Sequence, residues 1–322
     1  MNKPSDKSPN DVWDLVSIGE TMALMREERQ AKKESCFRLG FGGAESNVLT
    51  QVSRLGLRAR WFSSLGQDSF GELVRLGLAS QNVDTVLHDA NSRPTGFMVK
   101  TYGDRIDPEV EYFRSNSAAS QIRPTDLNLD DLFRTRMLHM TGIFPALSPE
   151  ASQSSMRVFE EARGREVPIS FDVNYRKKLW DESDASKYMR QIWRHSTYLF
   201  GDREELSLLF EGTPPDSDEA LLAELSEQSR VVVLKKGSSG AAAIAAGDYI
   251  SVPAAPADVV DTVGAGDAFV GGFLTGMLFS LEVRAALSLA TICGAAACES
   301  RGDWEGQIGV SQLTNEMKGL LR

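Results

Sequence analysis

The sequence is poor in the residues that build disulfide frameworks, metal clusters and membrane spans. Its 322 residues include three cysteines and three scattered histidines, too few for a disulfide scaffold or a histidine–cysteine metal site. No Gly-Lys pair occurs, which excludes a Walker A loop, and no GxGxxG fingerprint follows the first predicted strand, which argues against a dinucleotide-dependent dehydrogenase. The longest apolar stretch, residues 285–298, is too short and too interrupted to cross a bilayer.

The charge balance narrows the range of partners. Nucleic acids and anionic membrane surfaces attract basic proteins, so a formal net charge of -10 argues against both. Residues 1–12 are polar and include two prolines, and we expect a disordered tail there rather than a signal peptide. Residues 13–322 contain enough apolar residues for one large domain. The few cysteines are typical of reduced thiols in a cytoplasmic protein.

Short apolar runs alternate with longer segments of helical character along most of the chain. This alternation predicts an α/β fold with a mainly parallel sheet that is covered by helices on both faces. The predicted strands lie at residues 15–18, 59–65, 137–140, 167–171, 198–200 and 231–235, and the predicted helices at 45–55, 68–81, 149–163, 203–210 and 218–228.

Two stretches interrupt the alternation. Residues 22–39 and 94–113 have period-two patterns and turn residues but no long helix. They predict antiparallel strands outside the main sheet. We expect these strands, at about residues 20–40 and 93–115, to form a lid over the functional site.

The most specific segment is Asp-Thr-Val-Gly-Ala-Gly-Asp-Ala-Phe at residues 261–269. Its two glycines allow a tight loop that leads into an apolar segment, residues 268–277, predicted as a buried helix. The unpaired N–H groups and the dipole of a helix N-terminus favour an anion at such a loop. Asp267 places a carboxylate beside it. We interpret Asp267 as a base that accepts a proton from a hydroxyl while the loop stabilises a transferring phosphoryl group.

This nine-residue string resembles the C-terminal signature of the ribokinase-like, or PfkB, carbohydrate kinases. The resemblance implies a three-layer α/β/α fold with a mainly parallel central sheet and a small β-sheet lid. It implies that Asp267 is the catalytic base and that the backbone of Gly264, Ala265 and Gly266 forms the anion hole. It also implies ATP and Mg²⁺ as cofactors and a homo-oligomer that associates through the lid.

A second glycine motif lies near the N-terminus. Gly42 and Gly43 let the backbone approach a ligand closely, and Asn47 offers both a donor and an acceptor to hydroxyl groups. The spacing resembles the GG-x-x-x-N signature of the same family. The resemblance implies that these residues bind the sugar.

Two arginines suggest an acidic substrate. Tyr112 and Arg114 follow the alternation of a predicted lid strand and share one face, and Arg176 follows the strand at 167–171. Arginine can hold a carboxylate with two parallel hydrogen bonds. The strings Tyr-x-Arg-x-x-Ser-Ala and Asp-x-Asn-Tyr-Arg-x-x-Leu-Trp resemble the 2-keto-3-deoxygluconate kinases of the family, and the resemblance implies that Asp303 also faces the substrate.

Two alternatives stay open at this point. The chain could phosphorylate a neutral sugar, such as fructose or ribose, or a nucleoside. It could also be a catalytically silent family member with a binding or regulatory role. The sequence does not distinguish the gluconate-derived keto-acid from its galactonate epimer.

The nucleotide side is assigned by resemblance. Glu205 matches the glutamate of the family's Asn-x-x-Glu element, which helps to organise Mg²⁺ indirectly. Asp202 replaces the usual asparagine, so its carboxylate either strengthens Mg²⁺ binding or caps the following helix. Lys235, Gly237 and Gly240 are implied to contact the ribose and phosphates of ATP.

A monovalent cation is also implied. Asp261, Ala297 and Gly302 fall where the family often holds an ion such as K⁺, next to the anion hole. Backbone carbonyls supply most of the ligands in such a site.

Overall fold

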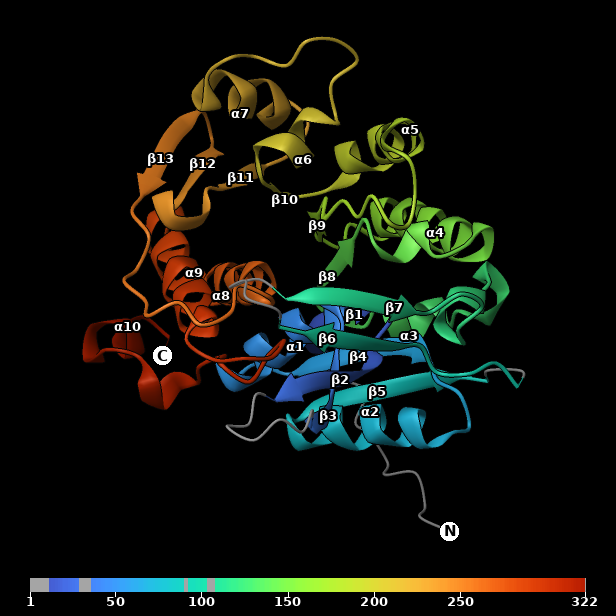
Figure 1. Cartoon of the computed structure of the whole chain (residues 1–322). Helices are drawn as coiled ribbons and strands as arrows, with labels where there is room; N and C mark the ends of the chain where they lie inside the picture. Colours follow the sequence, from blue (N-terminus) through green and yellow to red (C-terminus); the bar gives the residue numbers. More distant parts are fainter. Residues whose placement is uncertain (1–11, 29–35, 90–91, 103–107, 322) are drawn as a thin grey trace.

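The computed structural model describes residues 12–28, 36–89, 92–102 and 108–321. Of the tail predicted at residues 1–12, all but the last residue lie outside this range, and so do parts of the two predicted lid stretches. The described chain forms a large sheet flanked by helices and a smaller sheet beside it (Figure 1).

The main sheet has nine strands in the order β13-β12-β11-β10-β9-β8-β1-β4-β5. Every neighbouring pair from β11 to β5 is parallel, and β12 and β13 extend one edge in antiparallel pairing. The predicted α/β class is therefore confirmed. The strands are β1 (Trp13–Ile18), β4 (Ala59–Ser64), β5 (Val83–His88), β8 (Thr135–Thr141), β9 (Ile169–Asp172), β10 (Tyr198–Gly201), β11 (Val231–Lys235), β12 (Ala241–Ala245) and β13 (Asp248–Val252).

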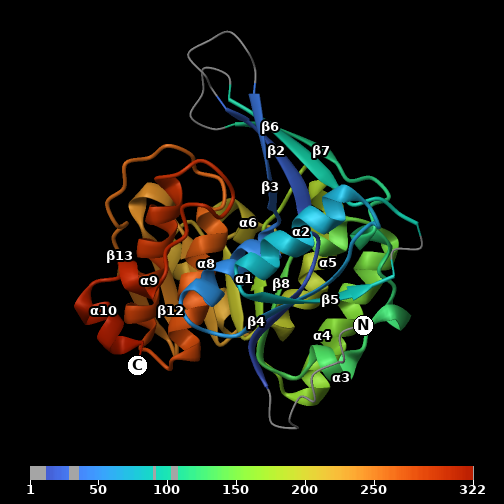
Figure 2. The same cartoon turned by 90° about the horizontal axis from the view of Figure 1, so that it is seen from below.

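The smaller sheet has the order β3-β2-β6-β7 and stands out from the main body (Figure 2). β2 (Met22–Glu28) pairs antiparallel with β3 (Cys36–Gly42), and β6 (Phe97–Thr101) with β7 (Glu109–Phe113). The central pair, β2 and β6, is parallel, so the prediction of antiparallel strands is wrong there. These two strands are joined through elements of the main body rather than by a turn, and they can therefore run in the same direction.

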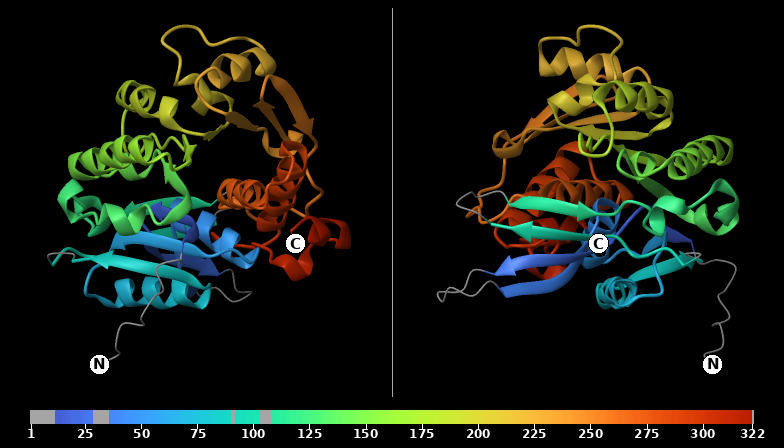
Figure 3. Two further views of the ribbon diagram at one scale, coloured as in Figure 1. Left: turned by 180° about the vertical axis from the view of Figure 1, so that it is seen from behind. Right: turned by 45° about the vertical axis from the view of Figure 1, so that its right-hand side comes forward.

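Helices cover both faces of the main sheet, as predicted (Figure 3). Apolar side chains of α1, α2, α8 and α9 pack on one face and those of α3, α4, α5, α6 and α7 on the other. Among the described residues, no helix is long and apolar enough to cross a membrane. The helices are α1 (Ala44–Arg54), α2 (Ser69–Ser80), α3 (Leu129–Leu132), α4 (Pro149–Arg165), α5 (Glu182–Ile192), α6 (Arg203–Ser207), α7 (Asp218–Ser226), α8 (Ala265–Leu278), α9 (Val283–Cys298) and α10 (Asn315–Leu320).

Local sequence signals explain where several helices begin. The Asp68 carboxylate accepts a hydrogen bond from Gly71 N at 2.8 Å, and Ser148 Oγ accepts one from Ala151 N at 3.0 Å. Both side chains satisfy N–H groups that have no partner inside their helix. The predicted helices consequently begin within about one residue of α2 and α4.

The segment after α9 returns to the N-terminal part of the chain. The indole ring of Trp304 stacks on Phe41 with centroids 4.8 Å apart, and its N–H donates to the Phe41 carbonyl at 3.0 Å. Gln307 Nε2 donates to the carbonyl of Asn47 at 2.9 Å. This C-terminal loop therefore closes against β3 and α1.

Candidate active site

The candidate site lies at the edge where the parallel strands end. Glu20 follows β1, Asp172 ends β9 and Lys235 ends β11. Ligands of open α/β sheets bind at these carboxyl ends. A hydrogen bond of 2.8 Å from Asn47 Nδ2 to Asp267 Oδ2 brings the first turn of α8 together with α1. The two glycine motifs are therefore neighbours in space.

The start of α8 has the features of an anion site. Gly264 lies in the left-handed region at φ 79, and a Cβ added to it would collide with the carbonyl oxygen of Asp303. No side chain caps the helix, and its first bond runs from Ala268 N to Gly264 O at 2.9 Å. The N–H groups of Gly266 and Asp267 precede that bond and are directed to the helix end. A Cβ on Gly266 would meet no atom within 4 Å, so the described chain leaves room for a ligand there.

Asp267 has the electrostatic setting of a base. Burial raises the pKa of its carboxyl group to about 7, although the Asn47 amide and the positive charge of Arg176 act in the opposite direction. The negative charges of Asp172 and Asp303 add to the upward shift. A carboxylate with a pKa near neutrality can accept a proton more readily than an ordinary aspartate.

Other parts of the chain pack closely against Gly42 and Gly43. A Cβ on Gly42 would collide with the Asp303 carboxylate, and one on Gly43 would collide with the carbonyl of Glu20. Each glycine is therefore required by a close contact within the described structure. We had expected close approach of a ligand at these positions, and that role stays a prediction.

Arg114 already has a carboxylate partner. Its Nε lies 2.6 Å and its Nη2 2.5 Å from Glu20 Oε2, and Ser117 Oγ donates to the other oxygen of Glu20. The guanidinium carbon lies 5.6 Å from the ring centre of Tyr112, so the two residues expected on one face do lie together. Sequence analysis missed Glu20, because the pair joins positions that are distant in the chain.

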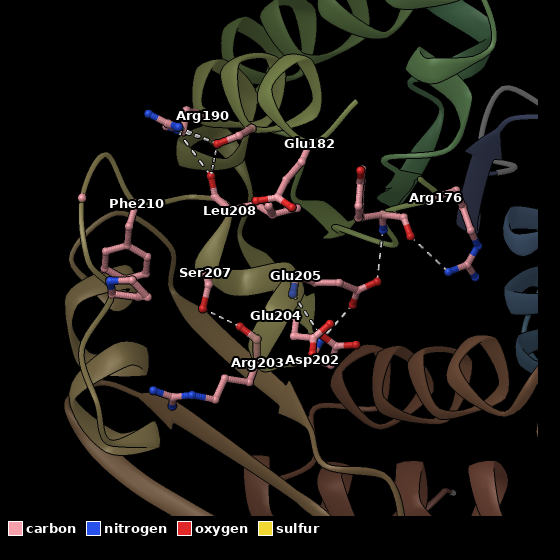
Figure 4. Close-up of a pocket in the computed structure, with 14 residues that line it drawn as sticks. Arg176, Glu182, Arg190, Asp202, Arg203, Glu204, Glu205, Ser207, Leu208 and Phe210 are labelled. Atoms are coloured by element: carbon pink, nitrogen blue, oxygen red, sulfur yellow. Dashed lines mark hydrogen bonds between the residues drawn. The ribbon is translucent and has the colours of Figure 1, made fainter. Parts of the chain in front are cut away.

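Arg176 is differently placed. Its side chain is exposed, and its Nη1 donates to the Tyr175 carbonyl at 3.4 Å (Figure 4). Within the described part of the chain, no carboxylate forms an ion pair with it. Its positive charge still lowers the pKa of Asp267, Asp172 and Glu205. Arg176 is therefore a cation near the base with its charge available to an anionic ligand.

Asp303 is not an exposed loop residue. Its carboxylate is buried and forms an ion pair with Lys100 of β6, a lysine that sequence analysis did not single out. A buried charge is tolerated when it is paired in this way. The pair joins the small sheet to the C-terminal loop beside Gly42.

The lysine at the end of β11 belongs to a buried ionic network. Lys235 Nζ lies 2.8 Å from Asp172 Oδ1 and 3.5 Å from Glu205 Oε2. Burial raises the pKa of Asp172 to about 6 in spite of the lysine. Asp172 is a third residue, after Glu20 and Lys100, that sequence analysis left unassigned. Carboxylate oxygens are the kind that Mg²⁺ prefers. Because Asp172 Oδ1 and both oxygens of Glu205 already have donors, these residues fit a magnesium ion held mainly through water.

Asp202 caps α6. Its carboxylate accepts from Glu205 N at 2.8 Å, and Glu205 Oε2 accepts from Asp202 N at 2.9 Å (Figure 4). This reciprocal pair is a capping box. The structure thus gives Asp202 the capping role that the sequence allowed, and it also fixes Glu205 in place.

The turn after β11 contains two glycines with positive φ, 54 at Gly237 and 91 at Gly240. A Cβ on Gly240 would collide with the carbonyl of Val252, so the neighbouring strand explains that glycine. A Cβ on Gly237 would meet no atom within 4 Å. Gly237 is therefore the position in this turn where a ligand has room.

The three residues implied for a monovalent cation come close together. Gly302 N lies 3.4 Å from Asp261 Oδ2, and both the Asp261 N–H and the Val260 N–H donate to the carbonyl of Cys298, the residue after Ala297. The Asp261 carboxylate and the Cys298 carbonyl therefore already accept hydrogen bonds.

A cavity of about 690 Å³ adjoins the site on the side of α5 and α6. It shares Arg176, Asp202 and Glu205 with the candidate site, and Arg190 lies at its far side (Figure 4). None of its lining residues belongs to the loop at residues 264–267. The cavity therefore lies beside Asp267 rather than over it.

A family model and several known proteins match the part of the chain that forms this site. A family model described as pfkB family carbohydrate kinase matches residues 13–307. A 2-dehydro-3-deoxygluconokinase from Bacillus subtilis (strain 168) is 33% identical, covering 91% of this chain and 92% of the relative. Probable fructokinase-4 of Arabidopsis thaliana is 29% identical, covering 86% and 87%. The crystal structure of a PfkB protein from Polaromonas sp. JS666 matches with a TM-score of 0.80 at 30% identity, covering 89% and 96%.

Proposed function

The chain belongs to the pfkB family of carbohydrate kinases, and we propose that it transfers a phosphoryl group from ATP to the terminal hydroxyl of a sugar acid, 2-keto-3-deoxygluconate. The observation that carries this proposal is the Asp267 carboxylate, which is held by Asn47 at the uncapped start of α8. Base and anion site are then adjacent, as phosphoryl transfer to a hydroxyl requires.

The chemistry follows from this geometry. The hydroxyl oxygen of the sugar forms a bond to the γ-phosphorus, the bond from that phosphorus to the ADP oxygen breaks, and Asp267 accepts the hydroxyl proton. The N–H groups of Gly266 and Asp267 stabilise the negative charge of the transferring group. Asp172 and Glu205 would hold Mg²⁺, directly or through water, and the ion would supply further neutralisation of phosphate charge.

The preference for an acid rests mainly on Arg176. Arg114 is already neutralised by Glu20, whereas Arg176 has no ion-pair partner among the described residues. Tyr112 and Arg114 would then orient the substrate, and Arg176 would supply attraction for its carboxylate. The neutralisation of Arg114 also supports a second candidate, a kinase for a neutral sugar such as fructose.

A substrate panel separates the two candidates. ATP consumption is measured with 2-keto-3-deoxygluconate, its galactonate epimer, gluconate, fructose, ribose and adenosine. We expect kcat/KM for the keto-acids to exceed that for fructose by about tenfold or more, because only the keto-acids offer a carboxylate to the exposed Arg176. Arg176→Ala should remove most of this preference and leave the rate with fructose nearly unchanged. A wild-type preference for fructose would favour the neutral-sugar kinase.

The pH profile tests the state of the base. Asp267 must be deprotonated to act, and burial raises its pKa to about 7. We therefore expect kcat/KM to be half-maximal near pH 7 and to fall about tenfold per unit further below. Asn47→Ala removes a hydrogen bond that lowers this pKa, so its acid limb should move to higher pH. The nucleotide titrates in the same way with the wild type and with Asn47→Ala, so it does not explain a difference between their pH profiles. Identical acid limbs for the two enzymes would contradict the assignment of Asp267 as the base.

We also propose that the small sheet is a lid, because it contributes Lys100 and Arg114 to the sugar side of the site. Its strands expose Phe37, Leu39 and Phe113 at 43%, 55% and 49%, and two copies would bury these side chains by associating through the lid. The molar mass in solution, measured by light scattering, tests this association.

The three unpaired cysteines support a cytoplasmic location as part of the same proposal.

A further inference from the structure

Two strands of the small sheet send side chains to the loops that flank the start of α8. Tyr102 follows β6, and its hydroxyl donates to Asp261 Oδ2 at 2.7 Å. Arg26 of β2 donates from Nη1 to the carbonyl of Arg301 and lies 3.2 Å from Glu305 Oε1. These are the loops in which the resemblance implied a monovalent cation. Tyr102 and Arg26 of the small sheet and its adjoining turn therefore contact the loops that were expected to bind the cation.

The Asp261 carboxylate is fully buried and satisfied by the chain itself. One oxygen accepts from Val263 N at 3.0 Å, and the other accepts from the Tyr102 hydroxyl at 2.7 Å and from Gly302 N at 3.4 Å. Burial and the bond to Asp261 raise the pKa of Tyr102, so the phenol keeps the proton that it donates. Three donors thus offset the negative charge that a cation would otherwise neutralise.

The neighbouring carbonyl groups are engaged in the same way. The carbonyl of Cys298 accepts from Val260 N at 2.8 Å and from Asp261 N at 3.2 Å. The carbonyl of Arg301 accepts from the guanidinium of Arg26. A cation needs several oxygen lone pairs directed at one point, and N–H and O–H donors already occupy those of the Asp261 carboxylate and the Cys298 carbonyl and one of the Arg301 carbonyl.

An ion pair already lies beside Gly302. A Cβ built on Gly302 would collide with Glu305 Oε2 and lie 2.6 Å from Arg26 Nη1, so this ion pair rests against the backbone expected to bind the cation. The guanidinium carbon of Arg301 lies 4.6 Å from the ring centre of Tyr102. Asp261 and Glu305, the two carboxylates beside Gly302, therefore already have hydrogen-bond donors within the chain. The donor set therefore does not fit K⁺.

We propose that Tyr102 and Arg26 take the place of the monovalent cation beside the anion hole, so that this enzyme needs no K⁺. Tyr102 is then a positioning residue: it holds Asp261, whose loop leads into Gly264. The carbonyl of Asp303, two residues after Arg301, packs against Gly264 from the other side. The lid strands consequently support both walls of the anion hole.

The first test compares salts on the whole enzyme at equal ionic strength: KCl, NaCl and tetramethylammonium chloride. We expect equal Tm values and rates that agree within about twofold. A bound ion would raise Tm by about 2 °C or more at saturating concentration. Higher Tm in KCl alone, or activation by K⁺ of about threefold or more, would overturn the proposal. The activity measurement rests on the proposed function, but Tm does not, so a lack of turnover in every salt would count against the function alone.

The second test uses Tyr102→Phe, with Tyr249→Phe of the edge strand β13 as the matched control. Loss of the hydroxyl leaves Asp261 Oδ2 short of its nearest donor. We expect kcat to fall by about tenfold in tetramethylammonium chloride and to recover partly in KCl, where a cation can now bind. Tyr249→Phe should behave as wild type. Tyr102→Phe with wild-type kcat in all three salts would contradict the positioning role.

Discussion

Asp267→Asn should lower kcat by at least about a hundredfold, the usual minimum for loss of a general base. The amide has the size of the carboxylate, and its oxygen can still accept the hydrogen bond from Asn47 Nδ2, which spans 2.8 Å in the wild type. What it loses is the ability to accept the hydroxyl proton. Steady-state kinetics with the best substrate of the panel measures the effect, and nucleotide binding by calorimetry should stay near wild type.

Stability supplies the control for this variant. Burial raises the pKa of Asp267 to about 7, so the folded protein favours the protonated carboxyl group. That contribution to stability is present below the unfolded pKa and is lost as the pH rises through about 7. The neutral amide avoids the loss, and Asp267→Asn should unfold at an equal or higher Tm at pH 8. Near-normal turnover, or a marked fall in Tm, would contradict the assigned role.

Gly264→Ala should damage both fold and catalysis. Gly264 has φ 79, and its added Cβ would collide with the carbonyl of Asp303. A non-glycine residue in this conformation costs about 1–3 kcal/mol before any clash is counted. The loop must then shift, and its N–H groups move away from the transferring phosphoryl group. We expect a lower Tm together with a loss of kcat of about a hundredfold or more, the range for a lost oxyanion donor.

Gly266→Ala is the matched comparison, two residues further along the same loop. Its Cβ would meet no atom within 4 Å, and alanine favours helix more than glycine does. Tm should therefore be unchanged or slightly higher. Activity should still fall, because the methyl group enters the space assigned to phosphate. If Gly266→Ala were fully active, the anion hole would have to lie elsewhere.

The parts of the fold that the sequence predicted correctly depend on local signals. Apolar runs between helical segments predicted the parallel strands, and polar residues such as Asp68 marked helix starts. The loop at residues 261–269 was recognisable because its glycines and carboxylate are adjacent in the chain. Sequence analysis missed β5 and the edge hairpin β12-β13. Their apolar segments are short and show no clear hydrophobic periodicity compared with the adjacent predicted elements.

The partners of the charged site residues could not be predicted in this way. Glu20 and Arg114 are 94 positions apart, and Lys100 and Asp303 are 203 apart. No local pattern marks either pair, because each forms only when the small sheet meets the main body. The parallel pairing of β2 with β6 was missed for the same reason.

The closure of the C-terminal loop has a consequence for the protein during its synthesis. Phe41 and Trp304 are separated by 263 positions, and Asn47 and Gln307 by 260. The surroundings of Asn47 are therefore complete only after residues 304–307 have been synthesised. A chain that stops before residue 304 would lack the contacts to Phe41 and Asn47, and its site around Asn47 would stay open on that side.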